Sequence, residues 1–176
     1  FARHGIVPDM ITMGKPMGNG IPISGLAAKE DVLAAFSDKL PYFNTFGGNP
    51  VSIAAAQAVL KYIKDENLQE HCKKAGAALL KALKEVQERH PESVGDVRGA
   101  GLFLGFEFVK NDGNKTPDKD MALNVIEMLR DEHILTSVIG HYGNILKLRP
   151  PMVFSENDID WFATSLDKCI TKLENK

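Results

Sequence analysis

Lys15 stands in an unusual setting for a lysine, between Gly14 and Pro16 and directly after the apolar run 10–13, MITM. We expect that run to be a short buried strand that projects the lysine from the end of a sheet, where α/β proteins hold their ligands. Burial lowers the pKa of a lysine, and the neutral amine is a nucleophile toward aldehydes. The placement favours a lysine that forms a Schiff base. A surface lysine in a loop is the alternative that the spacing alone leaves open.

A second segment with chemical potential is 44–50, NTFGGNP, which lies directly before an expected helix. Thr45 and two glycines would expose backbone N–H groups there, and glycine-rich turns at helix N-termini bind phosphate. An ordinary capped loop is the alternative. A Schiff-base lysine and a separate phosphate loop would together suit one cofactor, pyridoxal 5'-phosphate.

Other interpretations of the same residue types fail. Segment 14–20, GKPMGNG, lacks the residue order of a P-loop, and segment 99–105, GAGLFLG, lacks the spacing and the following helix of a dinucleotide fingerprint. The five histidines and two cysteines show no metal-ligand spacing, so we expect no metal site. Cys72 and Cys169 fall within helical patterns, which is typical of buried small hydrophobic residues rather than of disulfides.

Composition and charge narrow the function classes. The 176 residues carry a net charge of -2 with a pI of about 6.2, so the chain offers no basic field to nucleic acid or to an anionic membrane. No apolar run approaches the ~20 residues of a membrane-spanning helix. The chain opens at Phe1 without an initiator Met, and we expect a fragment of a longer, cytoplasmic enzyme. A mitochondrial location stays open because a targeting segment would precede Phe1.

The elements before residue 66 must position Lys15 and the phosphate loop. Asn49 followed by Pro50 is a good N-cap and first-turn pair for a helix after that loop. The expected elements are strands at 10–13 and 23–28, and helices at 29–38 and 50–65.

The elements after residue 66 have a different character. Asn67 is expected to cap a long amphipathic helix, and Ser155 with Asp158 forms a capping-box pattern for the last helix. The expected elements are helices at 68–90, 118–132 and 155–174, a strand-rich stretch at 94–109, and strands at 134–139 and 144–149. We therefore predict an α/β protein in three parts: residues 1–65 as the end of a large domain, 66–90 as a connecting helix, and 91–176 as a smaller α+β domain.

Four segments of the chain resemble, in the same order, signature segments of the class-III pyridoxal-phosphate aminotransferases. They are VPDMITMGKPMGNGIPIS (7–24), YFNTFGGNPVSIAAAQAVL (42–60), DVRGAGLFLGFEF (96–108) and ILKLRPPMVFS (145–155). The chain resembles most the branch that contains the alanine–glyoxylate aminotransferase 2 group and its phospho-lyase relatives. The resemblance implies fold type I, with a large, mostly parallel-sheet domain that binds the cofactor, a small C-terminal domain, and a homodimer with its active site at the subunit interface.

The resemblance also implies roles for three residues. Lys15 matches the lysine that carries pyridoxal phosphate, and Thr45 matches the threonine that reaches the cofactor phosphate of the neighbouring subunit. Arg149 matches an arginine that pairs with the substrate carboxylate, a task that suits a planar guanidinium. The implied reaction moves an amino group from an amino acid or amine to a 2-oxo acid such as glyoxylate or pyruvate, with Lys15 as the general base.

Two alternatives to amino transfer remain. One is a phospho-lyase that acts on phosphoethanolamine or a phosphohydroxylysine-like amine, because the segments around Lys15 and 150–155 are close to that branch. Arg149 favours a carboxylate-bearing substrate, since we expect lysine there in a phospho-lyase. The other alternative is a non-catalytic dimerisation module, which would not need Lys15, Thr45 and Arg149 together. The family's ring-nitrogen aspartate and main phosphate loop are expected upstream of Phe1, so we expect the 176-residue piece alone to have little activity.

Overall fold

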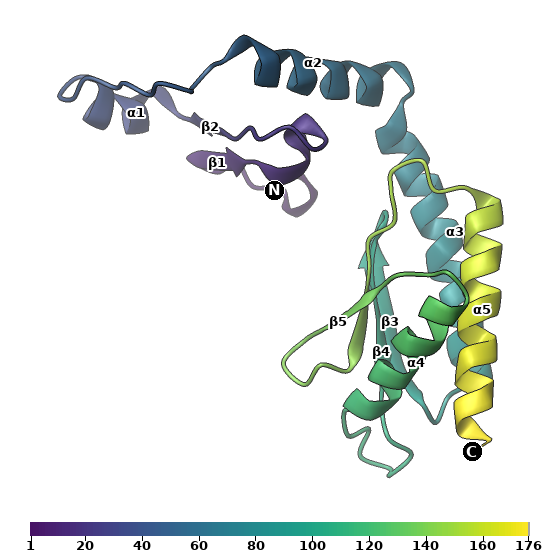
Figure 1. Cartoon of the computed structure of the whole chain (residues 1–176). Helices are drawn as coiled ribbons and strands as arrows, with labels where there is room; N and C mark the ends of the chain where they lie inside the picture. Colours follow the sequence, from purple (N-terminus) through teal and green to yellow (C-terminus); the bar gives the residue numbers. More distant parts are fainter. Residues whose placement is uncertain (176) are drawn as a thin grey trace. The chain divides into compact units, whose positions relative to one another are not determined.

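The computed structural model describes residues 1–175, which fold as two compact units (Figure 1). The first unit is Phe1–Glu66, and the second begins at Asn67. The first contains 3-10 helices η1 (Ala2–His4) and η2 (Lys15–Gly18), strands β1 (Met10–Met13) and β2 (Gly25–Ala28), and helices α1 (Glu30–Ser37) and α2 (Pro50–Asp65). The second contains helices α3 (Leu68–Arg89), α4 (Lys119–Asp131) and α5 (Glu156–Glu174), and strands β3 (Val94–Ala100), β4 (Phe103–Phe108), β5 (Ser137–Ile139) and β6 (Ile145–Leu148).

Strands β1 and β2 of the first unit form an antiparallel pair in which Met13 lies opposite Gly25. Strand β1 has the predicted bounds, and β2 is shorter than predicted. The prediction that β1 is buried is wrong for this structure, because only Ile11 of its four residues is even half-buried. A two-stranded pair cannot cover its own faces, and little apolar surface packs on this one.

The predicted side-chain caps form at Asn49 and Ser155 but not at Asn67, although α3 begins at Leu68 as predicted. Asn49 accepts a backbone N–H bond at 3.0 Å at the start of α2. Ser155 and Asp158 form the predicted capping box of α5. Asn67 precedes α3 with a φ of 48° and makes no side-chain cap. A capping residue needs an extended backbone to aim its side chain at the first free N–H groups, and the left-handed Asn67 does not have one.

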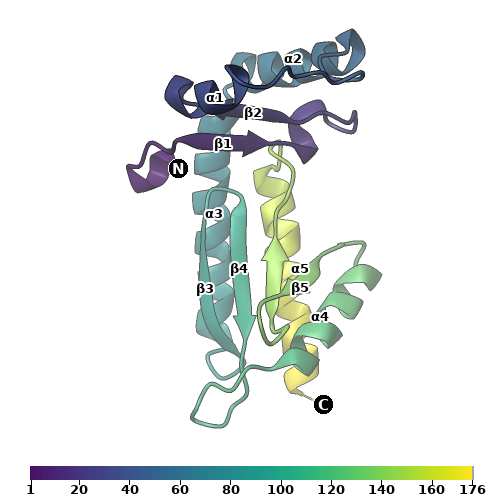
Figure 2. The ribbon, with the colours of Figure 1, turned by 90° about the vertical axis from the view of Figure 1, so that its left-hand side faces the viewer.

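The sheet of the second unit is antiparallel, with the strand order β3-β4-β6-β5. Figure 2 shows this sheet in front of α3 and α5, which lie behind the same face. Leu146 and Leu148 of β6 point into the core, and Lys147 between them does not. Strand β5 covers only the last half of the predicted 134–139, because its partner β6 offers only residues 145–147 for pairing.

The core of the second unit lies between the sheet and its helices. Phe106 and Phe108 are fully buried at its centre, with ring centroids 5.3 Å apart in an edge-on arrangement. Helix α3, which the sequence predicts as the connecting helix, supplies part of this core. The buried core residues are Ala75, Leu79, Leu83, Val86, Val94, Val97, Leu104, Phe106, Phe108, Ala122, Val125, Leu129, Leu146, Leu148, Ile159, Phe162, Leu166, Cys169 and Ile170.

The C-terminal ends of α3 and α5 are joined by a buried histidine. The His90 ring contacts Glu174 Oε2 through Nδ1 at 2.7 Å and Asp167 Oδ1 through Nε2 at 3.2 Å. Arg89 donates to the same Asp167 oxygen at 2.7 Å. Both ring nitrogens are therefore satisfied, as a buried polar group requires, and this cluster has a structural task.

Candidate active-site residues

Lys15 lies where the sequence predicts, just past the end of a strand. Strand β1 ends at Met13, Gly14 follows in an extended conformation, and Lys15 is the first residue of η2. Its φ is 46°, a left-handed conformation that side-chain-bearing residues rarely adopt and that costs about 1 kcal/mol or more. Such strain clusters at functional sites, where the surrounding structure holds it in place. The same backbone region is occupied by Asn19, Asn67, Lys115 and His133, so the strain supports a role for Lys15 only together with its other features.

The Lys15 side chain lines a hollow of about 720 Å³ in the first unit. The side chain is exposed and makes no hydrogen bond or ion pair with any residue in 1–175. The hollow is lined by Lys15, Pro22, Ile23, Ser24, Asn44, Phe46, Gly47, Gly48, Asn49, Ser52 and Ile53, with no carboxylate among them. An uncommitted primary amine beside glycine backbone, with no acidic neighbour to repel a phosphate, fits an aldehyde-bearing phosphate ester such as pyridoxal phosphate.

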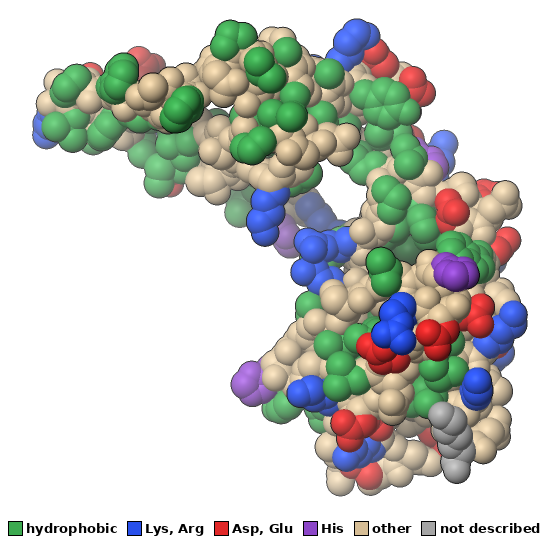
Figure 3. Space-filling model, viewed as in Figure 1, with side chains coloured by type: hydrophobic (Ala, Val, Ile, Leu, Met, Phe, Trp, Pro, Cys, Tyr) green, Lys and Arg blue, Asp and Glu red, His purple; other side chains and the backbone are tan. Residues whose placement is uncertain are grey.

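The expectation that Lys15 is held out of water is not met within this unit. Gly18 and Ser52 are the buried residues in its elements, and its large apolar side chains are mostly exposed. Figure 3 shows apolar side chains gathered along α1 and α2 on the viewed face. With so little apolar surface folded inward, the unit has nothing to cover the amine.

The turn across the same hollow is held by Asn44, a residue that sequence reasoning missed. Asn44 Oδ1 accepts N–H bonds from Phe46 at 3.3 Å and from Gly47 at 3.1 Å. Asn49 Nδ2 donates to the carbonyl of Phe46 at 3.1 Å. The signal was present, because asparagine commonly bonds the backbone two residues ahead and so closes such turns.

Thr45 sits at the start of that turn and is exposed, without lining the hollow itself. Its neighbours Asn44 and Phe46 do line it. The structure thus brings Lys15 and the 44–49 turn to one hollow, and it leaves Thr45 exposed outside the lining of that hollow.

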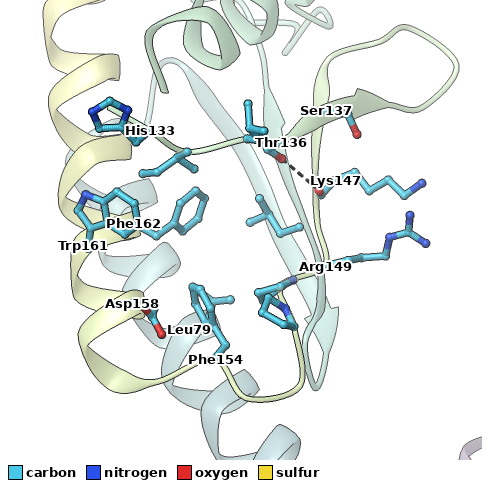
Figure 4. A pocket seen from close by; sticks show the side chains of 15 residues that line it. Leu79, His133, Thr136, Ser137, Lys147, Arg149, Phe154, Asp158, Trp161 and Phe162 are labelled. Carbon is cyan, nitrogen blue, oxygen red and sulfur yellow. Dashed lines mark hydrogen bonds between the residues drawn. The ribbon is translucent and has the colours of Figure 1, made fainter. Parts of the chain in front are cut away.

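Arg149 belongs to the second unit, directly after β6, with Lys147 two residues before it. Side chains alternate along a strand, so residues two apart share a face. Figure 4 shows both cationic side chains directed to the side opposite Trp161 and Phe162. Neither cation pairs with a carboxylate among residues 1–175. Sequence reasoning missed Lys147, although the alternation in ILKLR carried the signal.

Acidic groups near these cations have other partners. Lys147 and Arg149 border a cavity of about 510 Å³, and Asp158 also lines this cavity. Hydrogen bonds from the Ser155 hydroxyl and backbone N–H hold the pKa of Asp158 below its usual range. On the sheet, Arg98 donates to Glu107 at 2.6 Å and to Asp96 at 2.7 Å. The bond to Glu107, with that to Asp96, raises the pKa of Arg98. Lys147 and Arg149 are therefore available for an outside anion.

Two other kinds of site find no support in the part of the chain that the structure describes. No group of histidine, cysteine and carboxylate side chains within 1–175 could hold a metal ion. None of the described helices is both long and apolar enough to cross a bilayer. Cys169 is buried as expected, and burial raises the pKa of its thiol, which keeps it unreactive. Cys72 is only half-buried, so the expectation of a buried residue is wrong for that cysteine.

Comparison with known proteins adds the family. Residues 1–170 match the family model described as aminotransferase class-III. The chain is 45% identical over 168 residues to ethanolamine-phosphate phospho-lyase homolog 1 of Caenorhabditis elegans, covering 95% of this chain and 36% of that protein. It is 36% identical over 173 residues to alanine–glyoxylate aminotransferase 2 homolog 2, mitochondrial, of Arabidopsis thaliana, covering 98% of this chain and 36% of that protein.

Solved structures agree with these sequence similarities. A phospholyase from Arthrobacter in complex with phosphoethanolamine superposes with a TM-score of 0.90 at 38% identity, over 94% of this chain and 39% of that chain. A Bacillus anthracis aminotransferase gives 0.89 at 34% identity, over 98% of this chain and 40% of that chain. The chain thus spans little more than a third of the length of the proteins it matches.

Proposed function

Because this chain belongs to the class-III aminotransferase family, we propose that Lys15 is the residue that carries the family's cofactor in the full-length protein. Family membership confirms the resemblance seen in the four sequence segments, and it implies pyridoxal 5'-phosphate as the cofactor. The solved relatives confirm the predicted fold class, α/β, as part of a pyridoxal-phosphate-dependent transferase. The observation that carries the proposal is the free, strained Lys15 beside a glycine-rich hollow.

The residues of this chain would divide the work between binding and proton transfer. When bound, the cofactor ring supplies an electron sink. Lys15 Nζ would hold the cofactor through its aldehyde group and would serve as the base that takes a proton from the substrate carbon that bears the amine. Arg149 and Lys147 bind the substrate's anionic group and orient that carbon.

The reaction we propose first is amino transfer from an amino acid or amine to a 2-oxo acid. Relatives from Arabidopsis and Drosophila named for alanine–glyoxylate amino transfer, at 36% and 38% identity, support it. The planar Arg149 guanidinium suits a carboxylate, which both an amino acid donor and an oxo-acid acceptor carry.

A second candidate is the elimination of phosphate from phosphoethanolamine. Two observations favour it: the 45% identity to a phospho-lyase homolog and the TM-score of 0.90 to a phospholyase that binds phosphoethanolamine. A third observation is that Lys147 and Arg149 lie on the same face without acidic partners, because two such cations suit a dianionic phosphate better than one carboxylate.

We also propose that two copies of the protein assemble around the active site. Tyr42, Phe43 and Phe46, next to Thr45, are 74%, 86% and 82% exposed. Aromatic side chains so exposed in one loop are typical of a subunit interface. A second copy seated there would cover the loop and receive the Thr45 hydroxyl, which we propose binds the partner's cofactor phosphate.

Two parallel assays of the full-length holoenzyme separate the reactions. Amino transfer predicts pyruvate from L-alanine with glyoxylate, whereas the lyase predicts phosphate, acetaldehyde and ammonia from phosphoethanolamine and water. Lys15→Ala is the control and should lack both activities, because it removes the base and the covalent link at once. A wild-type holoenzyme inactive in both assays, or Lys15→Ala with undiminished turnover, would overturn the proposal.

A further inference from the structure

Two side chains at the start of α3 hold the segment that follows Arg149. His71 Nε2–H donates to the carbonyl of Phe154 at 3.0 Å, across 83 residues of sequence. The Cys72 thiol donates to the carbonyl of Met152, with sulfur and oxygen 3.7 Å apart. Burial raises the pKa of the Cys72 thiol, so the S–H donor is retained at neutral pH. The imidazole supplies the stronger of these two bonds, since a thiol is a weak donor.

The rest of this segment is stiff, so the anchor at Phe154 acts on its whole length. Pro150 and Pro151 fix two consecutive φ angles. Phe154 N–H donates to the carbonyl of Pro151 at 3.0 Å, and the Phe154 ring packs against the core. Ser155 N–H donates to Asp158 at 2.8 Å as α5 begins. Because the 150–154 segment is short and restrained in this way, a shift of Phe154 at its end should also shift the backbone next to Arg149 at its start.

Arg149 depends on this segment for its direction. Strand β6 ends one residue before it, and the proline after it restricts its backbone to extended conformations. Nothing within residues 1–175 hydrogen-bonds or pairs with its guanidinium. The direction in which the Arg149 side chain leaves the backbone is therefore set by β6 on one side and by the 150–154 segment on the other.

We propose that His71 is a positioning residue that, through the Phe154 carbonyl and the 150–154 segment, aims Arg149 at the anionic group of the substrate. The inference rests on the proposed function, in which Arg149 binds that anion. His71 itself touches neither substrate nor cofactor. His71 contributes one N–H donor. Glutamine at this position can present an amide N–H from the same helix turn and should therefore preserve the function, whereas alanine has no donor and should not.

The test compares three variants of the full-length holoenzyme: His71→Ala, His71→Gln and Gln69→Ala. Gln69 is an exposed polar residue on the same helical turn and serves as the matched control. The amino-transfer half-reaction is followed spectroscopically with L-alanine and with ethylamine, which lacks an anionic group, and phosphate release is followed with phosphoethanolamine. In parallel, amide hydrogen exchange is measured at Phe154 and Ser155.

We expect His71→Ala to raise the half-saturating concentration of the anionic donor about tenfold, the usual worth of one lost hydrogen bond. The maximal rate and the response to ethylamine should change less than about twofold, because the proton-transfer residues are untouched. Exchange at Phe154 and Ser155 should be about tenfold faster. His71→Gln should restore both readouts, and Gln69→Ala should change neither.

The outcomes separate this inference from the proposed function. A wild-type holoenzyme that reacts with none of the three amines refutes the proposed function and the inference with it. A reactive wild type combined with an unaffected His71→Ala refutes the inference alone. So does an equal loss toward ethylamine and the anionic donors, or a His71→Gln variant that behaves as His71→Ala does, because either result assigns His71 a general structural task.

Discussion

Gly76 offers the sharpest test of how α3 packs into the second unit. A Cβ atom built at Gly76 would lie 2.2 Å from the carbonyl oxygen of Gly101 and 2.3 Å from its carbonyl carbon. Carbon atoms in contact normally lie about 3.5–4.0 Å apart, so Gly76→Ala requires a movement of about 1 Å. The obstacle is backbone in the β3–β4 turn, which cannot rotate away as a side chain would. The helix and the turn must therefore separate.

The expected magnitude follows from two opposing contributions. Alanine is better than glycine inside a helix by about 1 kcal/mol. Overpacking costs about 1–3 kcal/mol, and a backbone obstacle places this case at the upper end. The net result is a loss of about 2 kcal/mol, equivalent to about a 30-fold change in an equilibrium constant.

Native-state amide hydrogen exchange of α3 and β4 in the full-length protein measures this loss directly. Ala77→Gly, at the neighbouring exposed position, is the matched control, and we expect it to cost about 1 kcal/mol through helix propensity alone. If the amides of α3 and β4 exchange in Gly76→Ala as slowly as in the wild type, or more slowly, then α3 does not approach the β3–β4 turn as closely as the structure shows.

Three further predictions test other parts of the molecule. Phe106→Ala removes a fully buried ring at the centre of the second unit. It should lower the free energy of unfolding, measured by hydrogen exchange of β4, by about 3–5 kcal/mol. Phe103 is exposed, and Phe103→Ala should lower it by less than about 1 kcal/mol. Asn44→Ala removes the acceptor of two turn N–H groups and should weaken pyridoxal phosphate binding about tenfold by spectroscopic titration, with an unchanged affinity contradicting the role of the turn. Asp158 has its pKa lowered by the bonds from Ser155, so its contribution to stability is present above the usual aspartate range, near pH 4, and is lost as the pH falls through the lower folded value. The thermal midpoints of wild type and Asp158→Asn should therefore converge as the pH falls below about 4, and a gap that widens in acid would refute this.

Local signals in the sequence predicted much of the fold, because helix caps and strand alternation involve near neighbours. The Asn49–Pro50 pair and the Ser155–Asp158 box begin α2 and α5 as predicted. Asn67 shows the limit of such reasoning, since its left-handed backbone prevents a cap that its residue type favours.

Contacts between distant residues could not be predicted from one sequence. The bond from His71 to Phe154 and the approach of Gly76 to Gly101 depend on how α3 packs, which no spacing encodes. For the candidate site, the glycine-rich bend predicted Lys15, and the structure added Asn44, which holds the turn beside it.

The central claim is that Lys15 Nζ carries the cofactor. Borohydride reduction of the full-length protein with pyridoxal phosphate, followed by peptide mass spectrometry, tests it most directly. We predict one phosphopyridoxyl group per chain on the peptide that contains Lys15, and none in Lys15→Ala. A stoichiometric label on another lysine, with Lys15 unmodified, would contradict the claim.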